Sequence, residues 1–202
     1  MAIDGIPLLK PRLYKTWQVI YNAAMNRIDE SRAFMPLGIA VLTVSDTRTP
    51  SNDKSGDTLV ALLTASGHKL ADRALLRDDV NSIRGKVAEW IGLSGIDVVL
   101  TTGGTGFTGR DVTVEAVKPL FDKEIDGFSA LFHRLSFDKI GTSTIQSRAC
   151  GGLAQGTYIF CLPGSPGACQ DAWDGILRWQ LDIRHRLCNF VEIMPRLMEH
   201  VG

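Results

Sequence analysis

Residues 97–106 read Asp-Val-Val-Leu-Thr-Thr-Gly-Gly-Thr-Gly, and this segment points most directly to the fold class. Its first six residues form a nearly continuous apolar and β-branched run, which is typical of a strand buried on both faces of a parallel sheet. The glycines that follow allow the backbone to turn sharply and to approach a ligand closely. The segment therefore predicts a buried strand that ends in a glycine-rich loop.

Further strands and helices alternate on both sides of this segment. Strands are predicted at residues 39–44, 71–76 and 158–162. Stripes of apolar residues at helical spacing lie between the strands. This order predicts a doubly wound α/β domain, in which helices cover both faces of a mostly parallel sheet and form three layers. We expect the domain to span residues 37–202.

The charge balance excludes some classes of partner. Lys plus Arg and Asp plus Glu both total 22, so the formal charge is 0. Nucleic acids and anionic membranes attract proteins with a basic excess, so we expect neither as a partner. The four cysteines form no C-x-x-C pair, and their spacing does not fit a zinc site. Reduced core cysteines and the absence of a signal-peptide pattern predict a cytoplasmic protein.

Residues 1–36 precede the regular pattern and form an N-terminal arm. Its apolar residues at helical spacing are Tyr14, Trp17, Tyr21, Ala24 and Ile28. They predict an amphipathic helix that packs on the domain, with binding to a partner as the alternative. The longest apolar run of the arm is far below the roughly 18 residues that a membrane-spanning helix needs.

The predicted glycine-rich loop consists of Thr102, Gly103, Gly104, Thr105 and Gly106. Doubly wound sheets bind ligands outside the carboxyl ends of their strands, which is where this loop is expected. Successive backbone N–H groups in such a turn form an anion-binding hollow, and the two threonine hydroxyls add donors. The loop matches neither the dinucleotide pattern G-x-G-x-x-G nor the P-loop. We expect it to bind phosphate, the alternative being an ordinary tight turn.

Acidic residues follow several strands at the same predicted edge of the sheet. Asp53 precedes the first helix, Asp78 follows the second strand, and Asp111 follows the glycine-rich loop. Asp111 would either cap a helix or hold a cation close to bound phosphates. If the three loops converge, their carboxylates are suited to a magnesium nucleotide. Asp57 is explained by helix capping.

Two later segments also have the composition of ligand-binding loops. Pro163, Gly164 and Ser165 follow the strand at 158–162 and precede a helix, whose N-terminus attracts anions. Ser147 and Arg148 end a segment rich in hydroxyl groups. That segment would form a solvated turn or would hold a polar heterocycle or an anion.

Six segments with characteristic residues occur in order along the chain. They are Leu42–Asp46, Asp53–Gly56, Thr101–Gly106, Gly109–Thr113, Gln146–Ala149 and Leu162–Ser165. Together they resemble the MoaB/MogA family of molybdenum cofactor biosynthesis proteins, over residues 37–195. Residues 135–144 and 188–190 look like the MoaB branch of this family.

The resemblance implies a molybdopterin-binding fold and a specific reaction. Active members transfer AMP from ATP to the terminal phosphate of molybdopterin, release pyrophosphate and use Mg²⁺. By the resemblance, Asp78 and Asp111 are the catalytic acids, and Asp53 and Asp78 are associated with Mg²⁺. The glycine-rich loop would hold the nucleotide phosphates, and the segments around Ser147 and 163–165 would lie on the pterin side.

Other interpretations keep the same fold. One is a non-catalytic molybdopterin-binding or scaffold protein, and another is a nucleotide-phosphate enzyme such as the hydrolase domains of the competence-damage type. The retained acids Asp78 and Asp111 favour the adenylyltransferase.

The resemblance also implies a homotrimer or homohexamer. Large apolar residues that a domain of this size is not expected to bury completely support an oligomer. They are Phe128, Leu131, Phe132, Trp173 and Trp179.

Overall fold

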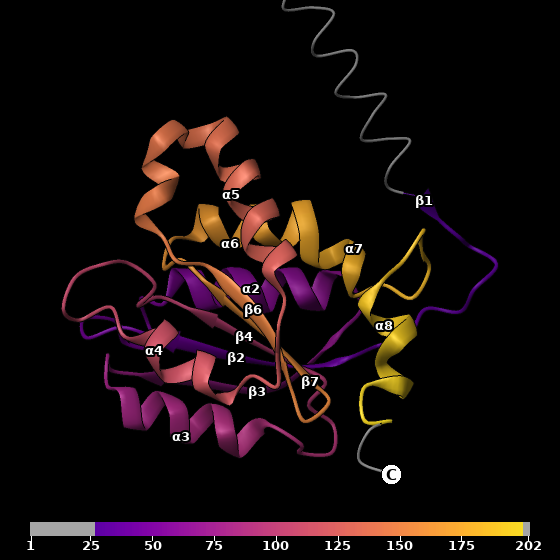
Figure 1. Ribbon diagram of the computed structural model, residues 1–202, viewed down its shortest axis with the longest axis horizontal. Coiled ribbons are helices and arrows are strands. Elements are labelled where there is room, and N and C mark those ends of the chain that lie inside the picture. The colour runs from indigo at the N-terminus through magenta and orange to yellow at the C-terminus, as the bar shows by residue number, and fades with distance from the viewer. Residues whose placement is uncertain (1–26, 200–202) are drawn as a thin grey trace, which may run out of the picture.

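The computed structural model describes residues 27–199, which form a central sheet with helices on both faces (Figure 1). The six strands of this sheet lie in the order β3-β2-β4-β7-β6-β5. Their bounds are β2 (Gly38–Val44), β3 (Lys69–Leu76), β4 (Val98–Thr102), β5 (Lys123–Glu124), β6 (Cys150–Ala154) and β7 (Thr157–Leu162). The first four strands in this order are parallel, and β6 and β5 each pair antiparallel with their neighbour. The predicted three-layer, mostly parallel α/β fold is therefore confirmed.

The helices divide between the two faces of the sheet (Figure 1). One face is covered mainly by α2 (Lys54–Ala65), α5 (Asp126–Ile140), α6 (Pro166–Ala172) and the π-helical turn η3 (Trp173–Leu177). The other is covered by α3 (Val80–Trp90) and α4 (Thr113–Val117). The remaining helices are η1 (Lys118–Leu120), η2 (Gly141–Gln146), α7 (Arg178–Gln180), α8 (Phe190–Ile193) and η4 (Met194–Arg196). No helix within residues 27–199 is long and apolar enough to cross a membrane.

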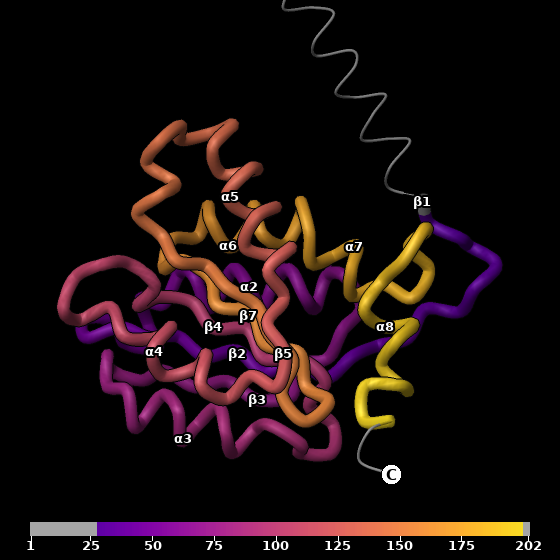
Figure 2. The backbone as a smooth tube through the Cα atoms, in the orientation of Figure 1, coloured from indigo at the N-terminus to yellow at the C-terminus, as the bar shows by residue number. Residues whose placement is uncertain are grey.

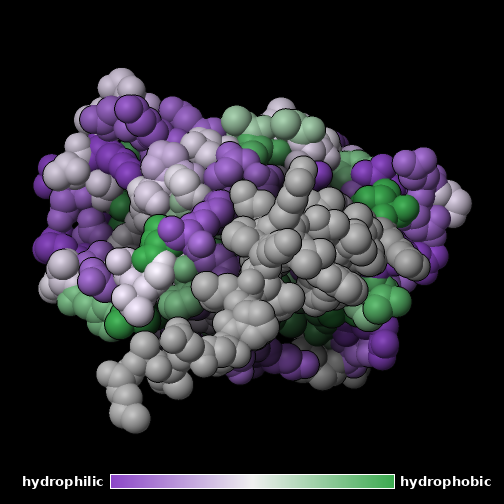
Figure 3. Space-filling model, turned by 90° about the horizontal axis from the view of Figure 1, so that it is seen from above, coloured by the Kyte–Doolittle hydropathy of each residue, from purple (hydrophilic) through white to green (hydrophobic). Residues whose placement is uncertain are grey.

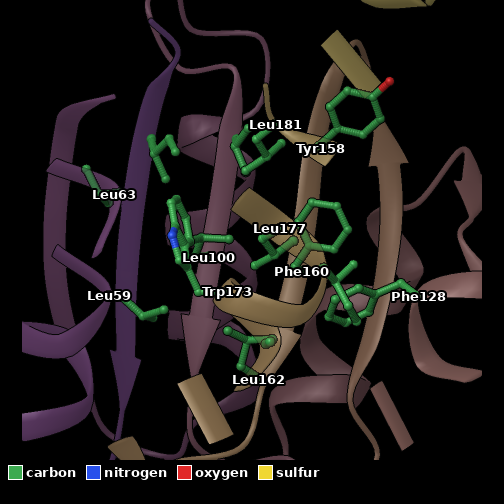
Figure 4. Close-up of a cluster of buried hydrophobic side chains, with 14 of the residues drawn as sticks. Leu59, Leu63, Leu100, Phe128, Tyr158, Phe160, Leu162, Trp173, Leu177 and Leu181 are labelled. Carbon is green, nitrogen blue, oxygen red and sulfur yellow. The ribbon is translucent and has the colours of Figure 1, made fainter. Parts of the chain in front are cut away.

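Each face of the sheet has its own buried core, because the continuous apolar strands present side chains on both sides. On the α2 and α6 face, Leu100, Phe160 and Leu162 from the strands pack with Trp173 and Leu177 (Figure 4). On the α3 face, Val99 and Ile159 meet Val87 and Trp90. Packing on both faces of the sheet positions the strand ends, and with them the loops that follow.

The beginning of the described chain pairs with a segment near its end and forms a second, small sheet. In it, β1 (Arg27–Ile28) pairs antiparallel with β8 (His185–Arg186). Ile28 therefore lies in a strand, and not in the amphipathic helix predicted for the N-terminal arm; the rest of that helix lies outside the described residues. Figure 2 shows β1 and α8 on the right of the molecule, while the loop between β4 and α4 lies on the left.

The apolar residues offered as evidence of an oligomer are largely buried within one chain. Phe128, Phe132 and Trp173 are all buried in the core beside β7. The expectation that these three residues form an oligomer surface was wrong, because α5 and η3 pack their aromatic residues onto the sheet. Leu131 is exposed, together with Phe137, Ile140 and Ile145 on α5 and η2. In the view of Figure 3, the apolar surface that is visible forms separate patches between polar residues.

Candidate functional site

A polar pocket of about 420 Å³ lies at the carboxyl ends of the parallel strands. The chain runs from β2 to β3 on one side and then to β4 on the other side of β2. Loops diverge at such a switch point and leave a crevice, which is where doubly wound sheets bind ligands. The pocket is lined by Val44, Ser45, Thr47, Arg48, Asp78, Gly103, Gly104, Thr105, Gly106, Arg110, Asp111, Gln146, Ser147, Pro163 and Gly164.

The glycine-rich loop has a backbone that only glycine tolerates well. Gly103 and Gly104 have φ angles of +103° and +63°. A Cβ on Gly103 would collide with the carbonyl oxygen of Val44 at the end of β2. Thr113 fixes the turn from the other side, because its Oγ1 donates to the Gly103 carbonyl (2.8 Å) and its N–H donates to the Gly104 carbonyl (3.0 Å). The loop is therefore closely packed and lies open only on its pocket side.

Asp78 faces this loop. Within the described residues, no side chain donates a hydrogen bond to its carboxylate. A Cβ on Gly104 would lie 2.9 Å from its Oδ1, so the carboxylate lies directly against the loop. Burial and the negative charge of Asp46 raise the pKa of Asp78, and Asp111 adds to this while Arg110 opposes it. A half-buried acid without a partner is suited to bind a cation.

Asp111 lies on the other side of the loop and is not a helix cap. The N-cap position of α4 is Val112, which makes no side-chain cap bond. The Oδ2 of Asp111 instead accepts from the N–H (2.9 Å) and the hydroxyl (2.6 Å) of Thr108. Burial raises the pKa of Asp111, but the two bonds from Thr108 outweigh it and hold the pKa below its usual value. Its carboxylate is thus kept charged beside Gly106.

Asp53 does not join this pair of acids, and the sequence-based expectation that it binds Mg²⁺ does not fit its surroundings. It is only 1% exposed and does not line the pocket. Its oxygens accept from Thr43 Oγ1 (2.7 Å), the Gly56 N–H (3.0 Å) and Arg73 Nη2 (2.8 Å). Burial raises its pKa, but these donors outweigh burial and lower it. Asp53 is also the N-cap of α2, a role that we had expected for Asp57.

The two arginines of the pocket differ in how they are held. Arg48 donates to the Gly164 carbonyl and to Ser55 Oγ, and thereby ties the loop after β2 to the loop after β7. Arg110 makes a bidentate ion pair with Asp46, with distances of 2.8 Å and 2.9 Å. Sequence reasoning did not select Arg48, and it left Arg110 open between a surface arginine and a phosphate clamp; Arg110 is 65% exposed and also lines the pocket. Their positions depend on loops far apart in sequence, so only the fold shows them.

The hydroxyl groups near the glycine-rich loop have mostly structural partners. Thr102 is fully buried and donates to the carbonyl of Pro163 (3.0 Å), so its predicted role as a phosphate donor is wrong. Thr105 Oγ1 lies 3.3 Å from Ser147 Oγ, and these two residues do line the pocket. His133 fixes this segment further, since its Nε2 lies 2.9 Å from the Ser147 carbonyl oxygen.

The loop after β7 contributes only part of the predicted ligand set. Pro163 and Gly164 line the pocket, and Gly164 packs so closely on the Cα of Gly103 that a Cβ would lie 3.2 Å from it. Ser165 lies outside the pocket lining and caps α6 by accepting from the Ala168 N–H (3.2 Å). The fold thus brings the loops that contain Gly103 and Gly164 side by side, whereas Ser165 caps a helix and does not face the pocket.

Arg148 braces the glycine-rich loop from behind. Its Nε donates to the Gly106 carbonyl (2.8 Å) and its Nη2 to the Asp111 carbonyl (2.9 Å), and it forms an ion pair with Glu115. It does not line the main pocket, and these partners occupy its donors. The predicted contact of Arg148 with a ligand therefore does not fit, and its observed contacts position the loop.

Phe107 is an exposed aromatic residue next to the pocket that sequence reasoning missed. It is 69% exposed and lines a second hollow of about 420 Å³ with Thr108, and this hollow shares Asp111 with the main pocket. The Arg148 guanidinium lies 5.3 Å from its ring centroid. The signal available in the sequence was a phenylalanine directly after the Gly-Gly-Thr-Gly run.

Comparison with known proteins identifies the class to which this fold and pocket belong. Residues 40–183 match the family model described as a probable molybdopterin binding domain. A solved structure titled molybdenum cofactor biosynthesis protein B superposes with a TM-score of 0.75 at 39% identity, covering 83% of this chain and 99% of that one. The tungsten cofactor synthesizing protein MoaB from Pyrococcus furiosus superposes with a TM-score of 0.64 at 32% identity, covering 83% and 98%. The fold is therefore that of the molybdopterin-binding domains.

The sequence relatives narrow this class to one family. Molybdenum cofactor biosynthesis protein B of Escherichia coli K12 is 48% identical over 160 residues, which are 79% of this chain and 94% of that protein. The protein of the same name from Bacillus cereus is 46% identical over 138 residues, 68% and 82% of the two chains. The chain belongs to the MoaB/MogA family of molybdenum cofactor biosynthesis proteins, as the ordered segments predicted.

Proposed function

We propose that the protein binds molybdopterin and adenylylates it with magnesium-ATP. The observation that carries this proposal is the placement of Asp78 and Asp111 on the two sides of the glycine-rich loop. The nucleotide phosphates would lie along the backbone from Gly103 to Gly106, and the pterin near Ser147 and Gly164. The molybdopterin phosphate would attack the α-phosphorus of ATP, and pyrophosphate would leave.

The acids of this pocket fit a Mg²⁺ ion that is bound jointly by the protein and the substrate phosphates. They do not form a site that would hold the ion by protein side chains alone. The described residues contain no group of three or more side chains suited to hold a metal. Mg²⁺ typically takes one or two carboxylates and completes its shell with substrate phosphates and water. Asp78 and Asp111 would supply these carboxylates, and the bound ion would neutralise charge on the reacting phosphates.

The protein's own part in the reaction is to bind and align two polyanions. Backbone N–H groups of the glycine-rich loop can donate to phosphate oxygens, and Arg48 and Arg110 line the same pocket, where Arg110 offsets the charge of Asp46. Thr113 and Arg148 hold the loop in this geometry. Alignment of the reactants can contribute several kcal/mol to the lowering of the barrier, roughly 7–11 kcal/mol in the best intramolecular reactions.

The test is to mix the purified protein with molybdopterin, ATP and Mg²⁺ and to quantify adenylylated molybdopterin and pyrophosphate. We expect product with the parent protein and about 10²-fold less with Asp78→Asn, by the loss seen when one electrostatic contact is removed. Glu89→Gln, on the exposed side of α3, is the control and should react like the parent. A parent protein that binds molybdopterin but forms no product would support the scaffold function instead.

A further inference from the structure

Two cysteines face each other across neighbouring strands. Cys150 in β6 and Cys161 in β7 are direct partners in the antiparallel register. Directly opposite residues project to the same face of a sheet, and both side chains belong to the core on the α3 and α4 face. Cys169 packs in the other core, and Cys188 lies exposed at the surface. The chain therefore contains one cross-strand pair of thiols.

The pair is open to small reagents on one side. Cys150 is 9% exposed and lines a pocket of about 360 Å³ together with Lys118 and Arg148, whereas Cys161 is fully buried. Contact with the Cys161 thiol lowers the pKa of Cys150, against the effect of burial and with help from Lys118. The same contact and burial raise the pKa of Cys161. Cys150 is therefore the thiol that ionises and reacts first.

We propose that Cys150 and Cys161 form an oxidisable dithiol that a hydroperoxide converts to an intramolecular disulfide. The Cys150 thiolate attacks the peroxide oxygen, and its sulfur becomes a sulfenic acid as water or an alcohol leaves. The Cys161 sulfur then attacks the Cys150 sulfur, and water leaves with the Cys161 proton. The two thiols lose two electrons in total, and the peroxide bond takes them up.

The strand geometry permits this bond and makes it reversible. Opposite residues of antiparallel strands have Cα atoms about 4.5–5.5 Å apart, within the range of about 4.4–6.8 Å that disulfides span. Their Cβ atoms are about 4.5–5.5 Å apart, whereas a relaxed disulfide prefers about 3.8 Å. Closing the bond must draw β6 and β7 together, and strained disulfides of this kind are reduced readily.

The position of the pair connects it to the main pocket, and this step rests on the proposed function. Arg148 lies two residues before Cys150 and donates to the carbonyls of Gly106 and Asp111. A shift of β6 would move this brace and loosen the glycine-rich loop. We therefore expect the disulfide to weaken magnesium-ATP binding by about fivefold, at the low end of typical coupling between sites.

The first experiment detects the bond itself. The parent protein is treated with hydrogen peroxide, remaining thiols are alkylated, and intact mass and chymotryptic peptides are measured. Tyr158 and Phe160 lie between the two cysteines and provide cleavage sites that separate them. We expect two of the four thiols to be lost, one Cys150–Cys161 crosslinked peptide, and full recovery with dithiothreitol.

Variants separate this pair from the other thiols. Cys150→Ser and Cys161→Ser should each abolish the crosslink, and Cys188→Ser should leave it intact. Crosslinks through Cys188 alone, or a Cys150 that reaches the sulfinic acid without any crosslink to Cys161, would overturn the proposal. Because the parent protein alone gives the decisive peptide, a variant that fails to fold does not prevent the test.

The second experiment compares magnesium-ATP binding of the reduced and oxidised parent by calorimetry. Weaker binding after oxidation, reversed by dithiothreitol, supports the coupling to the glycine-rich loop, and equal affinities reject it. If the crosslink forms but neither form binds magnesium-ATP, the proposed function fails while the dithiol stands. If magnesium-ATP binds but no crosslink forms, the dithiol fails while the proposed function stands.

Discussion

Gly104 lies so close to Asp78 that a Cβ at this glycine would be 2.9 Å from the Asp78 Oδ1, and it would also collide with the Thr113 hydroxyl. Glycine is therefore required at this position for two reasons. Its φ of +63° is unfavourable for other residues, and the Asp78 carboxylate leaves no room for a Cβ. This contact places an acid directly beside a backbone suited to phosphate. The loop and the acid are therefore packed directly against one another.

The first prediction concerns Gly104. We expect Gly104→Ala to weaken magnesium-ATP binding at least tenfold, because the added carbon displaces Asp78 and Thr113. The strained backbone should also lower the free energy of unfolding by at least about 1 kcal/mol. Gly109→Ala is the matched control on the same loop, since a Cβ there meets nothing within 4 Å. Titration calorimetry and chemical denaturation measure both effects, and unchanged binding in Gly104→Ala would remove the nucleotide from this loop.

Phe107 leads to a second prediction, which tests where the nucleobase lies. If phosphates bind along the glycine-rich loop, the adenine can reach the exposed ring of Phe107. Stacking of a base on an aromatic side chain contributes about 1–3 kcal/mol, so Phe107→Ala should weaken ATP binding by roughly tenfold. Binding of inorganic tripolyphosphate should not change. Equal losses for both ligands would show that Phe107 supports the loop and does not contact the base.

The third prediction concerns the oligomeric state. We propose that the protein forms a closed homotrimer or homohexamer. Phe137 and Ile140 are exposed near the end of α5, and Ile145 is exposed in η2. Light scattering at micromolar concentration should give the mass of a trimer or hexamer. The double change Phe137→Ser and Ile140→Ser should reduce that mass if this part of the surface is buried between subunits. Leu93→Ser, at a similarly exposed site between α3 and β4, is the control; a monomeric parent would contradict the proposal.

The fold and part of the site could be predicted because their signals are local. Continuous apolar runs identify buried parallel strands, and acids and glycines that follow such strands must meet at one edge of the sheet. This reasoning placed Asp78 and Asp111 near the glycine-rich loop. It failed for β6, whose sequence Cys-Gly-Gly-Leu-Ala lacks the β-branched residues typical of strands, and which is held by its hairpin with β7.

Side-chain roles that depend on register could not be predicted. Arg73 lies 20 residues from Asp53, and only the pairing of β3 beside β2 directs its guanidinium to that carboxylate. Because this partner is not visible in the sequence, the family resemblance and the expected convergence of the acidic loops assigned Asp53 to Mg²⁺. Arg148 likewise lies 42 residues from Gly106. It reaches the loop only because β6 runs antiparallel to β7, so that the start of β6 lies at the carboxyl ends of the parallel strands. Charge pairing across the fold decides which polar residues remain free for a ligand.

The last prediction uses the two acids to separate a catalytic role from a structural one. Both Asp78→Asn and Asp111→Asn should reduce adenylyl transfer by about 10²-fold, because each removes charge and keeps size.

The effects of these two changes on stability should be opposite. The pKa of Asp78 is raised by burial and by Asp46, so its ionisation opposes folding as the pH rises from its usual pKa to the folded one. At pH 7 that cost is fully present, and Asp78→Asn should raise the Tm. The pKa of Asp111 is lowered, since the bonds from Thr108 outweigh burial, so its charge stabilises the fold above the usual pKa and the gain is lost as the pH falls through the folded one. Asp111→Asn should therefore lower stability at pH 7, by about 1 kcal/mol if the amide still accepts from Thr108. Calorimetry and product assays on both variants decide the matter: full activity in either one would remove that residue from catalysis, and a fall in Tm for both would mean that Asp78 stabilises the fold.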